Sequence, residues 1–174
     1  AATQGVYAYI KHFALNDQET NRCSFLLTFA TEQAIRETYL KPFEMAVKNF
    51  TGTAQAVMSS YNFIGNVASC NNSDLLNTVL RDEWGFVGMV ITDYNGSYGY
   101  QTTDNCIKNG NDLMLGYGTA ESNQLNTESA TTVLAMRQAS KNILYTIANS
   151  GYYVDSSAAE ISTDGLNKMQ ITFY

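Results

Sequence analysis

Histidine and cysteine are scarce in this chain, and the shortage excludes one kind of site. Among 174 residues there are one histidine and three cysteines. Cys23, Cys70 and Cys106 are widely spaced, and His12 stands alone, so the paired ligand spacings of a zinc site are missing. We therefore expect neither a metal nor a cofactor. The odd number of cysteines also argues against a fully disulfide-bonded secreted module.

Basic residues and long apolar runs are also scarce. Ten Lys and Arg stand against sixteen Asp and Glu, giving a net charge of −6. No basic cluster is present, which argues against a nucleic-acid partner. No apolar run approaches the roughly 20 residues of a membrane span, so no membrane partner is expected. No signal peptide is visible at residues 1–10, which favours the cytoplasm, but a chain that begins in mid-protein would show none either.

What the chain does have is enough apolar and aromatic content for one globular domain. Hydrophobic residues make up 45% of the sequence, which excludes a disordered chain. Its twelve tyrosines combine flat apolar faces with hydroxyl tips, and such side chains can line a sugar site. For any single tyrosine, packing at the edge of the core is the simpler role. A mildly acidic, tyrosine-rich chain suits a neutral polar substrate.

Short β-like runs alternate with longer helical ones. Strands are expected at 6–10, 56–60, 89–92 and 113–115, and helices at about 31–49, 73–85, 103–109 and 128–149. Pro42 should kink the first helix or split it in two. Ser73 is a good N-cap for the second helix, and Gly85 is well placed to end it.

This order predicts an α/β fold with parallel strands and right-handed crossovers, built from about four βα units. Four units are too few for a closed eight-stranded barrel, which takes roughly 250 residues. An open doubly wound sheet would fit the length, and periodicity alone does not choose between the two. Residues 1–150 form the α/β unit, and the polar segment 151–174 is interpreted as a linker or tail.

Polar side chains gather just after the expected strands. Parallel strands end at one edge of a sheet, where α/β folds build their sites. Asp93 ends the most apolar strand, although capping the next helix would be an equally simple role for a lone carboxylate. The residues at this edge are Lys11, His12, Tyr61, Asn62, Asp93, Tyr94 and Tyr117.

Three ordered motifs resemble one family of enzymes. The run LRDEWGFVGMVITDY, which carries Asp93, resembles the segment of the family 3 glycoside hydrolases that ends at their nucleophilic aspartate. Many members have Ser and Trp where this chain has Thr92 and Tyr94. KHFALNDQE, with Arg22 beyond it, and MSSYN match two further motifs in the right order, as do the segments TEQAIRETYLKPFE and GNDLML. The resemblance spans roughly residues 4–150.

The resemblance implies the C-terminal half of a (β/α)8 TIM-type barrel from a β-glucosidase-like enzyme. Asp93 would attack the anomeric carbon and form a glycosyl-enzyme ester. Lys11 and His12 would donate hydrogen bonds to sugar hydroxyls, and Tyr61 would donate to Asp93 and orient it. The substrate would be an oligosaccharide or β-glycoside, whose sugar (glucose, xylose or arabinose) these residues do not decide.

The family's remaining catalytic parts would lie outside this chain. The general acid/base would come from a second α/β domain and the first half-barrel from residues before Ala1, so the chain is expected to be an inactive fragment that can self-associate. Domain order in the full protein stays open. For Arg22, Asp17 and Glu19 we expect ion pairing within a loop, and for Asp112 a hydrogen-bonding role rather than a second catalytic one.

Three other interpretations remain open. One is a non-catalytic carbohydrate-binding or scaffold domain derived from the same barrel, which the intact Lys11, His12 and Asp93 disfavour. Another is a phosphate-binding α/β enzyme, which would need a glycine-rich loop after the first strand. This chain has KHFA there, and residues 116–118 are only a weak glycine-rich signal. The third is a Ser-His-Asp hydrolase, but no G-x-S-x-G elbow is present.

Overall fold

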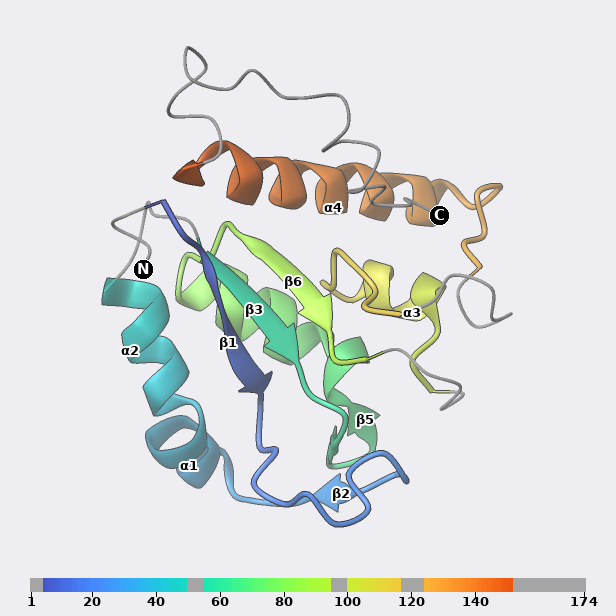
Figure 1. The fold of residues 1–174 in the computed structure, drawn as a ribbon. Helices are drawn as coiled ribbons and strands as arrows, with labels where there is room; N and C mark the ends of the chain where they lie inside the picture. The colour runs from blue at the N-terminus through green and yellow to red at the C-terminus, as the bar shows by residue number, and fades with distance from the viewer. Residues whose placement is uncertain (1–4, 50–54, 95–99, 117–123, 152–174) are drawn as a thin grey trace.

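The main sheet has three parallel strands in the order β1-β3-β6 (Figure 1). The computed structural model describes residues 5–49, 55–94, 100–116 and 124–151. Two predictions therefore lie outside the described residues: the tail after Gly151, and the position of Tyr117. Strand β1 (Ala8–Phe13) pairs with β3 (Gln55–Ser59), which pairs with β6 (Met89–Thr92). The predicted parallel α/β sheet is confirmed, and its strands end together at one edge.

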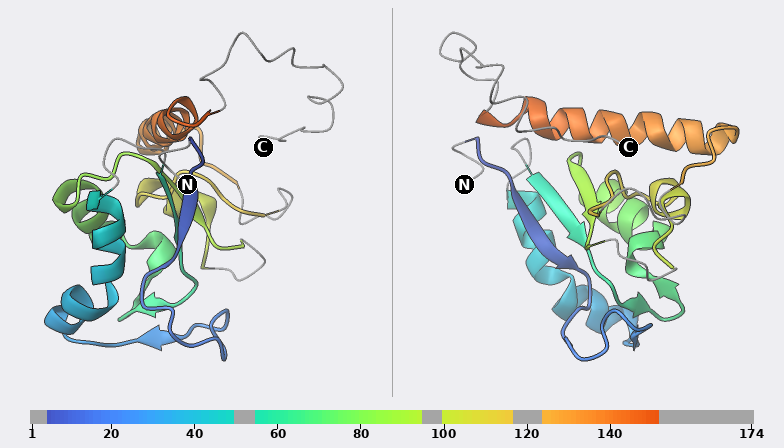
Figure 2. Two further views of the ribbon diagram at one scale, coloured as in Figure 1. Left: turned by 60° about the vertical axis from the view of Figure 1, so that its left-hand side comes forward. Right: turned by 45° about the vertical axis from the view of Figure 1, so that its right-hand side comes forward.

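Some of the helices cover one side of this sheet. The helical elements are α1 (Glu32–Ala34), the π-helical η2 (Ile35–Tyr39), α2 (Lys41–Asn49), the 3-10 turn η3 (Ser69–Asn71), the π-helical η4 (Asp74–Glu83), α3 (Thr103–Lys108) and α4 (Ala130–Ala148). Figure 2 shows α2 and the green η4 on the same side. Val57 and Val90 of the sheet pack there with Leu76, Leu80 and Phe13 in one buried cluster. None of the described helices is long and apolar enough to cross a membrane.

The predicted helix over 31–49 is divided, as its proline required. Thr31 caps its start by accepting a hydrogen bond from the Ala34 amide at 3.2 Å. The Leu40 amide bonds back to the Ile35 carbonyl at 2.8 Å, which closes η2, and a new helix then begins at Lys41. Pro42 lies in the first turn of α2, where backbone N–H groups have no acceptor within the helix, so the lack of an N–H in proline costs no hydrogen bond.

The start of η4 differs from the prediction by one residue. Asn72, not Ser73, provides the cap: its Oδ1 accepts from the Leu75 amide at 3.0 Å. Ser73 already has helical backbone angles and accepts a bond from the side chain of Asn77 instead. Gly85, with φ of +73°, follows the end of this helix as predicted. The other two predicted helices are confirmed, each slightly shortened, as α3 and α4.

The predicted fourth strand, 113–115, is wrong in extent. Leu113 makes one parallel bridge to Ile91, and no further pairing follows within the described residues. Side chains take the places that a strand's backbone would fill: Asp112 Oδ2 accepts from the Val90 amide at 2.7 Å, and Thr92 Oγ1 accepts from the Leu115 amide at 3.1 Å. The segment therefore runs beside β6 without becoming a regular strand.

A second, small sheet was not predicted. It orders β2 (Leu27–Thr28), β4 (Phe63–Ile64) and β5 (Val67–Ala68), with β2 parallel and β5 antiparallel to β4. Gly65, at φ of +61°, lies in the turn between β4 and β5. Figure 1 shows this sheet beyond the carboxyl ends of β1 and β3. It fixes the loops that follow those two strands, and these loops carry Arg22 and Tyr61 of the candidate site.

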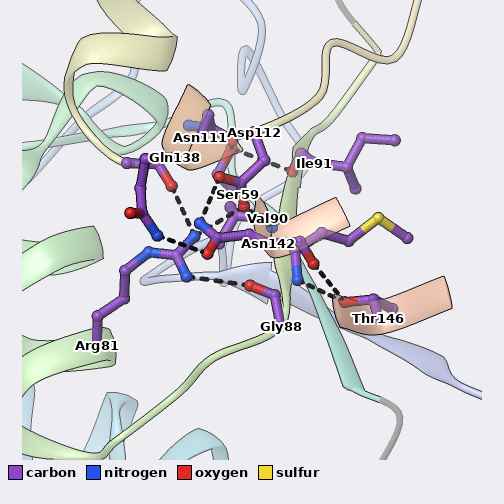
Figure 3. A network of polar contacts seen from close by, with 12 residues as sticks. Ser59, Arg81, Gly88, Val90, Ile91, Asn111, Asp112, Gln138, Asn142 and Thr146 are labelled. Carbon is purple, nitrogen blue, oxygen red and sulfur yellow. Dashed lines mark hydrogen bonds and ion pairs between the residues drawn. The ribbon is translucent and has the colours of Figure 1, made fainter. Parts of the chain in front are cut away.

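A buried polar network ties η4, the sheet and α4 together (Figure 3). Arg81 donates to Asp112 Oδ2 at 2.7 Å and to the Gly88 carbonyl at 3.0 Å. Asn142 of α4 donates to the other oxygen of Asp112 at 2.8 Å, and Thr146 accepts from the Met89 amide at 2.8 Å. Burial raises the pKa of Asp112, with the charge of Arg81 acting against that rise. The expected hydrogen-bonding role of Asp112 is confirmed.

Removing the Asp112 carboxylate should strongly destabilise the fold. Asp112→Ala would leave the Arg81 guanidinium, which is 13% exposed, without its counter-charge, and breaking such a buried pair costs about 3–5 kcal/mol in the free energy of unfolding. Urea unfolding of the two chains measures this difference. Glu44→Ala, which removes the exposed pairs with Lys41 and Lys48, is the control and should have a much smaller effect. Equal losses in both variants would contradict this role for the network.

Candidate active site

Asp93 directly follows the fully buried strand β6, at the edge where the three parallel strands end. Its amide donates to the Ser59 carbonyl of β3 at 3.1 Å, which extends the sheet pairing by one residue. Its side chain is only 10% exposed. The carboxylate is therefore carried by rigid backbone and has a fixed direction, as a reacting group requires.

Three polar groups contact the Asp93 carboxylate, two of them through hydrogen bonds. Arg22 Nη1 lies 2.9 Å and His12 Nε2 3.1 Å from Oδ2, and the Tyr94 amide donates to Oδ1 at 2.7 Å. Bonds from an ionised donor to a carboxylate are short and roughly twice as strong as neutral ones. This arrangement orients the carboxylate and compensates its charge.

Arg22 is the residue whose role the sequence did not predict. The expected loop ion pair is present, since Arg22 Nε lies 2.9 Å from Glu19 Oε2. The same guanidinium also binds Asp93 and stacks over the ring of Tyr61, 4.7 Å from its centroid. Partial burial acts to lower the pKa of Arg22, but the hydrogen bond and charge of Asp93 leave it above its ordinary value. Its position just beyond the KHFALNDQE motif was the available signal.

Tyr61 is placed beside the site with a different partner from the predicted one. Its hydroxyl donates to the Tyr94 carbonyl at 2.7 Å, so it holds the backbone that follows Asp93, whereas we expected it to donate to the carboxylate itself. Tyr61 is 3% exposed and supports Arg22 with its ring face. The neighbouring Asn62 is fully buried and donates to the Ala14 carbonyl at 3.0 Å, which ties this loop to the end of β1.

Lys11 and His12 fall inside β1, because the strand continues three residues beyond its predicted end at Ile10. His12 reaches Asp93, but Lys11 is exposed, and no hydrogen bond or ion pair of its ammonium is found within the described part of the chain. Lys11 lines a pocket of about 280 Å³ with His12, Asn16 and Phe43. The structure thus brings His12, Arg22, Tyr61 and Asp93 together and places Lys11 at the rim.

His12 is held in its neutral form. Burial is the largest effect and lowers the pKa of His12; the charge of Asp93 acts to raise it, while those of Lys11 and Arg22 lower it further. At neutral pH the imidazole therefore carries one ring proton. A carboxylate accepts but does not donate, so a proton on Nε2 suits the contact with Asp93.

No second carboxylate stands opposite Asp93 as an acid among the described residues. Glu19 is paired with Arg22, Asp112 with Arg81, and Asp17 lines the pocket beside Lys11. Within the same ranges, no group of three or more His, Cys, Asp and Glu side chains could hold a metal ion. The site on this chain is thus one oriented carboxylate with its hydrogen-bond donors.

Comparison with known proteins identifies the family. The sequence model described as "Glycosyl hydrolase family 3 N terminal domain" matches residues 2–119. This chain belongs to glycoside hydrolase family 3. Among family 3 relatives, β-glucosidase B of Emericella nidulans is 44% identical over 112 residues and β-glucosidase A of Butyrivibrio fibrisolvens is 40% identical over 119. These matches cover 64% and 68% of this chain, but only 12% and 14% of those enzymes.

A solved structure shows the same relation. β-Glucosidase 3B from Thermotoga neapolitana, in complex with glucose, superposes with a TM-score of 0.68 at 36% identity. The match covers 85% of this chain and 21% of that one. The family 3 chain described here therefore has the α/β fold of part of the family's N-terminal domain, and it spans a small fraction of its relatives' length.

Proposed function

We propose that this chain supplies the nucleophile of a retaining β-glycosidase that hydrolyses terminal β-linked sugars. The observation that carries the proposal is the geometry of Asp93: a largely buried carboxylate at the end of β6, oriented by Arg22, His12 and the Tyr94 amide. Relatives named β-glucosidases, one with glucose bound, support glucose as the sugar.

The reaction would proceed in two displacements. A carboxylate oxygen of Asp93 attacks the anomeric carbon, and the bond from that carbon to the aglycone oxygen breaks. An acid outside this chain gives its proton to the departing oxygen, so an alcohol leaves and a glycosyl ester remains. Water, deprotonated by the same group, then attacks the anomeric carbon, releases the sugar and restores the Asp93 carboxylate.

The neighbouring residues have distinct proposed roles. Lys11, exposed at the rim, would donate to hydroxyls of the bound sugar. His12, which we expected to do the same, faces Asp93 with Nε2 and would hold the nucleophile instead. Arg22 would hold the carboxylate ionised and aimed, and Tyr61 would keep Arg22 and the Tyr94 backbone in place. None of these groups requires a metal or a cofactor.

The proposal also assigns the chain a place in a larger protein. Residues 1–150 would form the C-terminal half of a (β/α)8 barrel, and 151–174 a linker or tail. The free edge of β1, which pairs only with β3 in the described sheet, is where another barrel strand would add. The missing half-barrel and an α/β domain with the acid would complete the site.

Product stereochemistry tests the reaction class. In the full-length enzyme that contains this chain, two displacements should release the sugar first as its β-anomer, because each displacement inverts the anomeric carbon. Proton NMR of the anomeric signals during the first minutes distinguishes the anomers before they equilibrate. Initial appearance of the α-anomer would mean direct attack by water and would exclude a nucleophilic role for Asp93.

A further inference from the structure

His12 is bracketed by two side chains, one on each ring nitrogen. Its Nε2 lies 3.1 Å from Asp93 Oδ2, and its Nδ1 lies 3.3 Å from Asn16 Nδ2. The Asp93 contact belongs to the site described above. The Asn16 contact comes from the loop that follows β1, four residues beyond the histidine in sequence, and has no role so far.

The proton positions follow from the charges around the ring. The groups that act on His12 are Asp93, Lys11, Arg22 and Glu19, and with its burial they keep the imidazole neutral at neutral pH. A single ring proton on Nε2 suits the contact with Asp93, because Asp93 is only an acceptor. Nδ1 then presents a lone pair, and its partner must be a donor. The amide nitrogen of Asn16 fills that position.

The environment of the Asn16 amide supports this orientation. Its oxygen is buried without a hydrogen-bond partner among the described residues. Leaving a buried acceptor unpaired costs free energy, so the contact of the amide nitrogen with Nδ1 is what favours this orientation. With the amide reversed, its oxygen would meet the Nδ1 lone pair, and the two acceptors would repel each other.

We propose that Asn16 is a positioning residue that fixes the tautomer and ring direction of His12, so that Nε2–H points at Asp93 Oδ2. Its importance for catalysis rests on the proposed function of Asp93. In the opposite tautomer a lone pair would face the carboxylate, and the ring would turn away. Asn16 would thereby keep one of the three polar contacts of the nucleophile without touching the substrate.

The chain offers a direct spectroscopic test, because His12 is its only histidine. Ring-labelled histidine in the whole 174-residue chain gives one set of imidazole signals, and long-range nitrogen–proton correlations distinguish the two tautomers. At neutral pH the wild-type ring should be the Nε2–H tautomer. Asn16→Asp replaces the donor by an acceptor, so the ring should shift to Nδ1–H or to the doubly protonated form, and the pKa of His12 should rise. Asn16→Leu, which has no donor, should give a mixture.

Gln18→Glu is the matched control. It makes the same amide-to-carboxylate change in the same loop, at an exposed side chain whose hydrogen-bond partner is the Thr20 carbonyl rather than His12. It should leave the Nε2–H tautomer unchanged. An Nδ1–H tautomer in the wild-type chain would overturn the proposal even if no variant folds, and so would an unaltered tautomer and titration in a folded Asn16→Asp chain. The readout needs no substrate, so a failure of Asp93 as nucleophile would be seen separately.

Discussion

Replacing Asp93 by alanine in the full-length enzyme should lower turnover of an aryl β-glucoside by on the order of 10⁴-fold or more. The covalent route needs a carboxylate at this position. Of the other described carboxylates, Glu19 is exposed and bound to Arg22, which also binds Asp93, and Asp112 is bound to Arg81. Asp93→Asn keeps the shape of the side chain but removes its charge, and it should lose turnover to a similar degree. Release of the aryl group, followed by absorbance, measures both variants.

Asp82→Ala is the control for this experiment. Asp82 is also a carboxylate close to β6 in sequence, but it is exposed on η4 and makes no hydrogen bond or ion pair within the described ranges. Its removal should leave turnover near the wild-type rate. If Asp93→Ala retained more than about a tenth of the wild-type rate, another group would have to be the nucleophile.

The 174-residue chain alone should show little or no hydrolysis of an ordinary alkyl β-glucoside, despite its intact nucleophile. General acid assistance to the leaving group is typically worth about 10²–10⁴-fold, and no described side chain is placed to provide it. An incomplete rim would also hold the sugar poorly. An aryl glycoside with a strongly acidic leaving group needs no protonation, so the rate deficit of the isolated chain should be smallest for that substrate.

The same preparation should self-associate. Among the described residues, β1 pairs on one side only, and at the opposite edge of the sheet β6 has a single bridge to Leu113. A sizing column run beside the hydrolysis assay measures both expectations. A stable monomer that turns over an alkyl β-glucoside at ordinary enzyme rates would contradict the fragment interpretation and the missing acid together.

Much of the fold was predictable because its signals are local. The run Met89–Thr92 is wholly apolar up to its last residue and became the buried strand β6, and Gly85 and Pro42 ended and divided helices through their own backbone restrictions. The two-residue strands β2, β4 and β5 are too short for any periodicity to show. The strand expected at 113–115 did not form because the side chains of Asp112 and Thr92 make hydrogen bonds that backbone groups would make in a strand. The hydrophobic pattern of the sequence does not reveal such side-chain hydrogen bonds.

The site was predictable in its members more than in its contacts. His12, Tyr61 and Asp93 follow or end parallel strands, so their shared edge could be inferred. Arg22 and its partner Asp93 are 71 residues apart in the sequence, and no local pattern predicts that the loop carrying Arg22 reaches Asp93. The hydroxyl of Tyr61 had two acceptors within one residue of each other, Asp93 and the Tyr94 carbonyl, and only coordinates distinguish them. Lys11 differs from His12 in exposure, although the two are adjacent.

Trapping of the covalent intermediate is the most direct test of the central claim, that Asp93 is the nucleophile. A 2-deoxy-2-fluoro β-glucoside with an activated leaving group forms the glycosyl ester but slows its hydrolysis, because the fluorine destabilises the oxocarbenium-like transition state. In the full-length enzyme, peptide mapping by mass spectrometry should place one glycosyl group on the peptide that contains Asp93, and Asp93→Ala should remain unlabelled. A label on a different carboxylate, or an unchanged label in Asp93→Ala, would contradict the account.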